Sequence, residues 1–265
     1  MTRICLIAFL SILPLPVLAE PLPPGLQAAR LLPGWIATDG SRMAALELVL
    51  EPGWKTYWRS PGDSGLPPEF DWSGSVNLVG VEFHWPQPEA IASGDDVSLG
   101  FHDRLVLPFT ARPAQAGQPV ELVAEISLGL CERICVPAHL SLRADGPDAH
   151  PDPEITQALA RGPVRSPLRP ACELREIEDG MQVNLHTPPA PVTPSPITAA
   201  AIELAQDPGI WVSSVQIVQM TDEVVLTADL VPPDGKPFEV DADKLRLTLI
   251  GPKGAVEMIG CNRAN

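Results

Sequence analysis

The sequence predicts an all-β protein, with an immunoglobulin-like antiparallel β-sandwich followed by a second, smaller β domain. The chain of 265 residues contains 32 prolines, and proline interrupts helices and is common in turns. Few stretches have the apolar spacing of a helical face, whereas several alternate apolar and polar residues with a period of two. The most regular of these runs from Val120 to Leu128. About eight such strands at short spacing, joined by turns, are typical of a β-sandwich.

The N-terminus has the pattern of a secretory signal peptide over residues 1–19. Arg3 gives a positive start, an apolar run follows from Ile4 to Leu13, and the small residue Ala19 ends the pattern. The apolar run is shorter than the roughly 20 residues that a membrane-spanning helix needs. We therefore expect export of the chain, cleavage near Ala19 and no membrane insertion of the mature protein.

The first β domain is predicted over residues 20–146, with a proline-rich, extended lead-in at residues 21–33. The pair Asp39-Gly40 can adopt the positive φ that a hairpin turn requires, so the first two strands are expected to form a hairpin. The expected strands are 34–38, 43–50, 54–59, 69–72, 76–85, 105–111, 120–128 and 139–143.

A proline-rich linker is predicted at residues 147–168, with one short helical stretch possible from Glu154 to Arg161. The second β domain would then span residues 169–265. Its expected strands are 172–177, 181–185, 199–204, 210–219, 223–230, 244–250 and 255–259. The last two are expected to form a hairpin about the turn Gly251–Gly254.

The chain carries a formal net charge of −15. A chain this acidic repels nucleic acid and anionic lipid, because both are negatively charged. We therefore expect no nucleic-acid partner. The sequence also lacks a flavin or nicotinamide signature, so no cofactor is expected.

Four cysteines remain once Cys5 leaves with the signal peptide, and their spacing favours the pairs Cys131–Cys135 and Cys172–Cys261. Cysteines of exported proteins tend to form disulfides. By a chain-entropy estimate, the long loop closed by Cys172–Cys261 stabilises the fold by about 4.5 kcal/mol and the short loop by about 2 kcal/mol. We therefore expect Cys172–Cys261 to be structural and Cys131–Cys135 to serve redox or metal chemistry.

The Cys131–Cys135 pair requires a sharp turn of the chain. A straight strand would hold the two Cα atoms about 13 Å apart, whereas a disulfide needs them within about 7 Å. Arg133 would lower the pKa of a neighbouring thiol, and Glu132 would oppose this effect. A permanent local staple is one alternative, and a site for a soft ion such as Cu(I) is another. The histidines considered as further ligands are His84, His102 and His139, but they do not cluster in the sequence and no resident metal is expected.

Aromatic residues gather at Trp54, Tyr57 and Trp58. They are interpreted as core residues of the sandwich, with a partner-docking surface as the alternative. Three carboxylates lie in predicted loops: Asp63, Asp95 and Asp96. We expect them to be solvated, but a carboxylate near the disulfide could move protons during exchange.

Three blocks of sequence follow one another in the first domain: Gly53–Pro68, Phe101–Pro108 and Leu128–Pro137. Together they resemble the N-terminal periplasmic region of bacterial thiol:disulfide interchange proteins of DsbD type. The resemblance covers about residues 30–143 and is closest to the branch associated with suppression of copper sensitivity. The membrane-spanning and thioredoxin-like parts of that family are not in this sequence, so electrons are expected to arrive from another protein.

The resemblance implies that Cys131 and Cys135 are a redox couple, with Cys135 attacking the partner. A membrane thiol–disulfide electron transporter would reduce the pair, which would then reduce oxidised periplasmic thioredoxin-like proteins. An aromatic cap over the disulfide would lie near Asp95–Phe101, where Phe101 is the aromatic residue. The Cys-x-x-Cys motif of an autonomous oxidoreductase is absent. The alternative function is therefore a non-enzymatic periplasmic binding module, for copper handling or as a structural partner of a membrane reductase.

Overall fold

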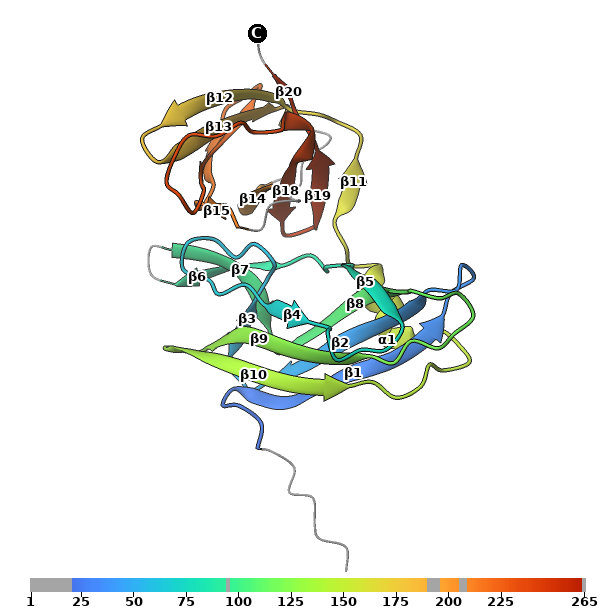
Figure 1. The fold of residues 1–265 in the computed structure, drawn as a ribbon. Helices are drawn as coiled ribbons and strands as arrows, with labels where there is room; N and C mark the ends of the chain where they lie inside the picture. The colour runs from blue at the N-terminus through green and yellow to red at the C-terminus, as the bar shows by residue number, and fades with distance from the viewer. Residues whose placement is uncertain (1–20, 94–95, 190–195, 205–208, 264–265) are drawn as a thin grey trace, which may run out of the picture.

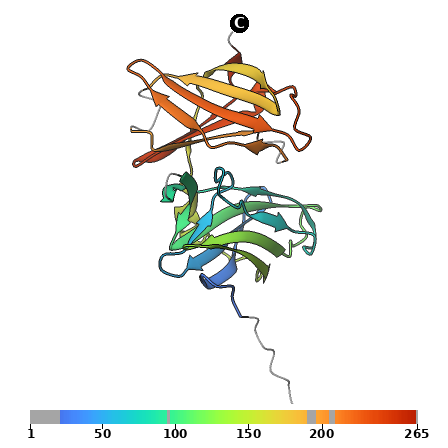
Figure 2. The same cartoon turned by 90° about the vertical axis from the view of Figure 1, so that its left-hand side faces the viewer.

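The strands form two β-sandwiches that follow one another along the chain (Figure 1 and Figure 2). The structure is a computed structural model that describes residues 21–93, 96–189, 196–204 and 209–263. Within these residues the strands build four sheets, which confirms the predicted all-β, immunoglobulin-like fold class. None of the helices in the described part of the chain is long and apolar enough to cross a membrane. The predicted signal peptide, residues 1–19, and Asp95 lie outside the described residues.

The first sandwich consists of a four-stranded sheet, β1-β2-β8-β5, and a six-stranded sheet. In the larger sheet β10-β9-β3-β7-β6 pair in that order, and β4 also pairs with β9. The bounds are β1 (Leu26–Ile36), β2 (Arg42–Leu50), β3 (Lys55–Tyr57), β4 (Glu69–Asp71), β5 (Leu78–Phe83), β6 (Glu89–Ser93), β7 (Asp96–His102), β8 (Arg104–Pro113), β9 (Val123–Cys131) and β10 (Cys135–Arg143). The core between the two sheets contains the fully buried side chains Leu107, Phe109 and Ile126, together with Trp58, which directly follows β3.

The lead-in predicted at residues 21–33 is wrong for most of its length, because β1 starts at Leu26 and pairs antiparallel with β2. The side chains of Leu26 and Leu32 are buried, and removal of their apolar surface from water stabilises the strand. Pro33 is tolerated because β1 is an edge strand whose register shifts between Leu32 and Trp35.

The stretch predicted as a linker, residues 147–168, contains regular structure. Helix α1 (Pro153–Leu159) begins after Asp152, whose carboxylate accepts hydrogen bonds from the first amides of the helix. Ile155 of this helix is fully buried against β1 and β2. Strand β11 (Val164–Ser166) then pairs in parallel with β19 of the second sandwich. The segment therefore contacts both sandwiches, and the domain boundaries at these residue numbers stay a prediction.

The second sandwich also has one smaller and one larger sheet. The smaller has the order β11-β19-β18-β14, and the larger has the order β15-β17-β13-β12-β20, with β16 also paired to β17. The bounds are β12 (Ala171–Ile177), β13 (Gly180–Thr187), β14 (Ala199–Leu204), β15 (Trp211–Val212), β16 (Gln216–Gln219), β17 (Val224–Val231), a 3-10 helix η1 (Ala242–Lys244), β18 (Leu245–Gly251), β19 (Gly254–Ile259) and β20 (Asn262–Arg263). The single strand predicted over residues 210–219 is thus divided into β15 and β16.

A disulfide joins Cys172 of β12 to Cys261, which directly precedes β20, with a Cα–Cα distance of 5.7 Å. Both cysteines are buried in the core of the second sandwich. The two sandwiches also share apolar contacts, because four residues of β14, β18 and β19 belong to the core cluster of the first sandwich. These are Ala199, Ala201, Ile250 and Ala255.

Candidate functional site

The Cys131–Cys135 disulfide closes a β-hairpin at one end of the six-stranded sheet. Strand β9 ends at Cys131 and β10 begins at Cys135, and the two residues face each other in antiparallel register. Their Cα atoms are 4.1 Å apart. The three intervening residues form the chain reversal that the sequence predicts, and this reversal brings the two sulfurs within bonding distance.

The two cysteines differ in their exposure to solvent. Cys131 is 1% exposed, whereas Cys135 is exposed at the start of β10. Ile134, the neighbour of Cys135 in the hairpin loop, is 77% exposed. A thiolate on another protein can therefore approach Cys135 more readily than the buried Cys131. Direct exchange on the buried sulfur would require the hairpin to open.

Tyr57 contacts both sulfurs. Its hydroxyl oxygen lies 3.1 Å from Cys131 Sγ and 3.2 Å from Cys135 Sγ. Because a disulfide carries no proton, the phenol O–H is the donor in these contacts. The Tyr57 side chain is buried, and burial raises the pKa of its phenol. The hydroxyl therefore keeps its proton at neutral pH and can donate a hydrogen bond to whichever sulfur becomes negative.

The pairing of β3 with β9 places Tyr57 beside the disulfide. Lys55 is the register partner of Cys131, and side chains two residues apart in a strand share one face of the sheet. Tyr57 therefore lies on the same face as Lys55 and Cys131. Trp58 is fully buried in the core of the first sandwich.

Two glycines make room for the Tyr57 ring. A Cβ atom at Gly129 would lie 3.1 Å from two carbon atoms of the ring and 2.9 Å from Leu66 Cβ. A Cβ atom at Gly65 would lie 3.1 Å from a third ring carbon and 2.2 Å from Pro61 Cβ. Larger residues at either position would displace the ring or the loop that covers it. The ring thus occupies a narrow space between β9 and this loop.

Lys55 adds a positive charge on the same face. Its side chain is buried, and its ammonium nitrogen lies 6.0 Å from the centroid of the Tyr57 ring. A cation near a cysteine favours the thiolate form, which is the reactive form in exchange. Arg133 and Glu132, the charged residues considered from the sequence, are both exposed in the hairpin loop.

The prediction that Phe101 caps the disulfide is wrong. Phe101 lies on β7 opposite Thr56, is 6% exposed, and stacks on Trp85 in the core with a ring-centroid distance of 6.3 Å. It therefore faces the interior of the sandwich. The aromatic residue at the sulfurs is Tyr57, which the sequence placed among the core or docking aromatics. Trp58 directly follows Tyr57, the last residue of β3, and adjacent residues of an extended chain point to opposite faces, so the sequence did contain an indication that the two side chains face opposite ways.

The histidines considered as metal ligands have separate partners. His84 is hydrogen-bonded to Thr110, His102 contacts Glu89, and His139 contacts Glu125. Within the described residues, no three His, Cys, Asp or Glu side chains are grouped so that they could hold a metal ion.

The loop carboxylates have different surroundings. Asp63, expected to be solvated, is exposed but accepts a hydrogen bond from the backbone amide of Ser214 in the second sandwich. Asp96 is the exposed first residue of β7. Asp63 is therefore engaged in a contact between the sandwiches that the sequence did not indicate.

Comparison with known proteins gives two matches for this architecture. Residues 28–144 match the family described as "Thiol:disulfide interchange protein DsbD, N-terminal". Among solved structures, the N-terminal periplasmic domain of ScsB from Proteus mirabilis is similar, with a TM-score of 0.63 and 24% sequence identity. The similarity covers 87% of this chain and 92% of that chain, so the shared fold extends over both sandwiches.

Comparison with curated protein sequences found no match. The family match includes β1 to β10 for most of their length, and with them the hairpin and the strand that carries Tyr57. It confirms the resemblance predicted from the sequence: residues 28–144, which contain Tyr57 and both sulfurs of the hairpin, are of the type found at the N-terminus of DsbD thiol:disulfide interchange proteins.

Proposed function

We propose that this is a periplasmic thiol–disulfide exchange protein that relays reducing equivalents through Cys131 and Cys135. The observation that carries the proposal is the asymmetry of the pair: Cys135, an exposed residue, is bonded to the buried Cys131, and the Tyr57 hydroxyl lies within 3.2 Å of both sulfurs. One sulfur can be attacked, and the other can leave with a proton donor beside it.

The proposed reduction follows from this geometry. A thiolate of a reduced donor attacks Cys135 Sγ, the Cys131–Cys135 bond breaks, and the electron pair of that bond goes to Cys131 Sγ. Tyr57 O–H stabilises the new thiolate by hydrogen bonding, assisted by the charge of Lys55. The second thiol of the donor then attacks its own sulfur in the mixed disulfide and releases Cys135. The donor leaves as a disulfide, and the pair has gained two electrons and two protons.

The reduced pair would pass its electrons on by the reverse chemistry. Cys135, as the exposed thiolate, attacks a disulfide of an oxidised partner, and Cys131 then attacks Cys135 Sγ to release the reduced partner and restore the bond. The family match supports a membrane thiol–disulfide electron transporter as donor and thioredoxin-like periplasmic proteins as acceptors. The likeness to a periplasmic domain supports the same location for this chain.

Trapping of mixed disulfides tests the proposal. The Cys131→Ser variant keeps the exposed nucleophile and lacks the residue that resolves the mixed disulfide, so it should accumulate covalent complexes with its partners. The Cys135→Ser variant keeps only the buried sulfur and should accumulate far fewer. Non-reducing electrophoresis with mass spectrometry identifies what is captured. Capture by neither variant would contradict the relay.

The reduction potential of the pair separates a relay from a permanent staple. Exchange proteins have potentials of roughly −120 to −270 mV, whereas structural disulfides have values below about −300 mV. We expect the Cys131–Cys135 couple in the first range, measured by equilibration with glutathione or dithiothreitol. A value in the second range would favour the local staple and the non-enzymatic alternatives.

A further inference from the structure

The loop between β3 and β4, residues 58–68, is one wall of the redox site. It leaves β3 directly after Tyr57. In its second half, Gly65 and Leu66 approach so closely that a Cβ atom at Gly65 would lie 3.1 Å from the Tyr57 ring, and Leu66 Cβ lies 2.9 Å from the Cβ position of Gly129. The position of the 58–68 loop therefore determines how much freedom the Tyr57 ring has above the two sulfurs.

The second sandwich binds the middle of the 58–68 loop through a reciprocal pair of hydrogen bonds. The amide of Asp63 donates to Ser214 Oγ at 3.3 Å, and the amide of Ser214 donates to the Asp63 carboxylate at 2.9 Å. Ser214 lies in the short segment between β15 and β16. The contact joins residues that are 151 positions apart in the chain, so it exists only when the two sandwiches are docked.

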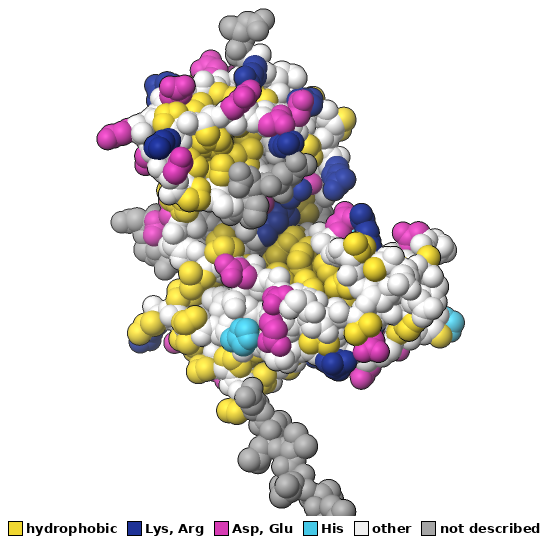
Figure 3. Space-filling model, in the orientation of Figure 1, with side chains coloured by type: hydrophobic (Ala, Val, Ile, Leu, Met, Phe, Trp, Pro, Cys, Tyr) yellow, Lys and Arg dark blue, Asp and Glu magenta, His cyan; other side chains and the backbone are white. Residues whose placement is uncertain are grey.

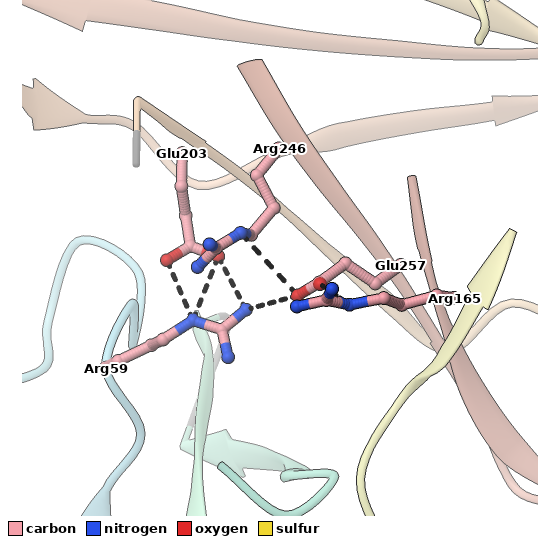
Figure 4. A network of polar contacts seen from close by, with 5 residues as sticks. All are labelled: Arg59, Arg165, Glu203, Arg246 and Glu257. Atoms are coloured by element: carbon pink, nitrogen blue, oxygen red, sulfur yellow. Dashed lines mark hydrogen bonds and ion pairs between the residues drawn. The ribbon is translucent and has the colours of Figure 1, made fainter. Parts of the chain in front are cut away.

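A second contact holds the first half of the loop (Figure 4). The Arg59 guanidinium donates to both carboxylate oxygens of Glu203 on β14 and to Glu257 on β19, at 3.0 to 3.2 Å. Arg59, Glu203 and Glu257 are each less than one-fifth exposed. The guanidinium also lies 4.0 Å from the Trp58 ring centroid. It thus joins a core residue of the first sandwich to two carboxylates of the second.

A groove between the sandwiches lies beside these contacts. It has a volume of about 700 Å³, with Arg59, Asp63 and Pro67 of the loop in its lining and Trp211 and Arg246 on the other side. Figure 3 shows hydrophobic and basic side chains in this hollow. Because the groove lies along the loop, the loop is not packed against the second sandwich over its whole length. Arg59 and Asp63 are therefore discrete points of attachment.

We propose that the second sandwich is a positioning element for the redox site. Through Arg59 and Asp63 it holds the 58–68 loop against the Tyr57 ring, and this keeps the hydroxyl within hydrogen-bonding distance of both sulfurs. Arg59 and Asp63 are positioning residues, because they reach the sulfurs only through Tyr57. The inference deepens the proposed relay and rests on it for its physiological meaning.

A double-mutant cycle on the full chain tests this coupling. The readout is the rate constant for reduction of Cys131–Cys135 by dithiothreitol, followed by alkylation and mass spectrometry. Tyr57→Phe removes the donor to the leaving thiolate and should slow reduction about tenfold. Asp63→Ala loosens the loop and should slow it about two- to fivefold. In the Tyr57→Phe background, Asp63→Ala should have no further effect, because no hydroxyl is left to position.

Conservative and control variants complete the test. Asp63→Asn keeps an acceptor for the Ser214 amide and should be reduced at the wild-type rate. Asp234→Ala, the control, lies at an exposed turn of the second sandwich and should leave the reduction rate unchanged. Arg59→Gln removes a more buried contact and should act in the same direction as Asp63→Ala. The inference is overturned if Asp63→Ala reduces at the wild-type rate, or if it slows both backgrounds by the same factor. Failure to capture partners would overturn the relay alone, since dithiothreitol needs no natural partner.

Discussion

The two disulfides of this protein lie in similar sandwiches but differ in exposure and in the length of the loop that each closes. Cys172 and Cys261 are 1% and 3% exposed, and they connect segments 89 residues apart in the core of the second sandwich. Cys131 and Cys135 are four residues apart at the end of a hairpin, and Cys135 is exposed. A buried bridge that closes a long loop constrains the unfolded chain strongly, whereas an exposed bridge across a hairpin constrains it little. Exposure and loop length, rather than the bond itself, indicate which disulfide is available for exchange.

Removal of each bridge should show the largest difference between them. Replacing both Cys172 and Cys261 with alanine should lower the free energy of unfolding by about 4.5 kcal/mol, against about 2 kcal/mol for the same change at Cys131 and Cys135. Denaturant unfolding under non-reducing conditions measures both values. Equal losses for the two double variants would contradict the assignment of one structural and one exchangeable bridge.

Selective reduction of the native protein should separate the bridges by rate. At neutral pH we expect dithiothreitol to open Cys131–Cys135 on the order of 100 times faster than Cys172–Cys261, because attack on a buried sulfur requires local unfolding. Timed alkylation and peptide mapping identify which cysteines have reacted. In a denaturant the two rates should converge. Comparable rates in the native state would show that burial does not protect the second bridge.

A rise to alkaline pH should have the smallest effect on the free energy of unfolding. The effect should come from Tyr57, which contacts the Cys131–Cys135 bridge. Tyr57 is the only tyrosine of the chain, and burial raises the pKa of its phenol. The native state therefore retains a proton that the unfolded chain loses above about pH 10, so stability falls as the pH rises through this range. Tyr57→Phe lacks this titration. The stability difference between wild type and Tyr57→Phe should therefore shrink above about pH 10, as measured by urea unfolding at several pH values.

Much of the fold could be predicted from the sequence because strands and tight turns depend on the pattern of neighbouring residues. The period of two from Val120 to Leu128 overlaps β9, which starts at Val123, and the Asp39-Gly40 turn joins β1 to β2. The strand from Leu26 to Pro33 was missed because proline suggested a lead-in, whereas an edge strand tolerates proline. Residue pattern alone cannot tell an edge position from an irregular one.

The candidate site could be predicted only in part, because its contacts are not local. The cysteine pair and the need for a turn follow from spacing. The contact of Tyr57 with the sulfurs depends on β3 pairing with β9, which joins residues more than 70 positions apart. The Asp63–Ser214 contact spans 151 positions. Neither has a signature in the neighbouring residues, so both required the three-dimensional structure.

The hairpin that carries Cys131 and Cys135 has a consequence for the proposed relay. Strands β9 and β10 are joined by nine register pairs, from Cys131 opposite Cys135 to Val123 opposite Arg143. The disulfide adds a covalent link only at the last of these pairs, so the ladder of backbone hydrogen bonds survives when the bond opens. Oxidised and reduced forms should therefore have nearly the same backbone. If the pair acts as the proposed relay, the hairpin would not need to refold between its oxidised and reduced forms.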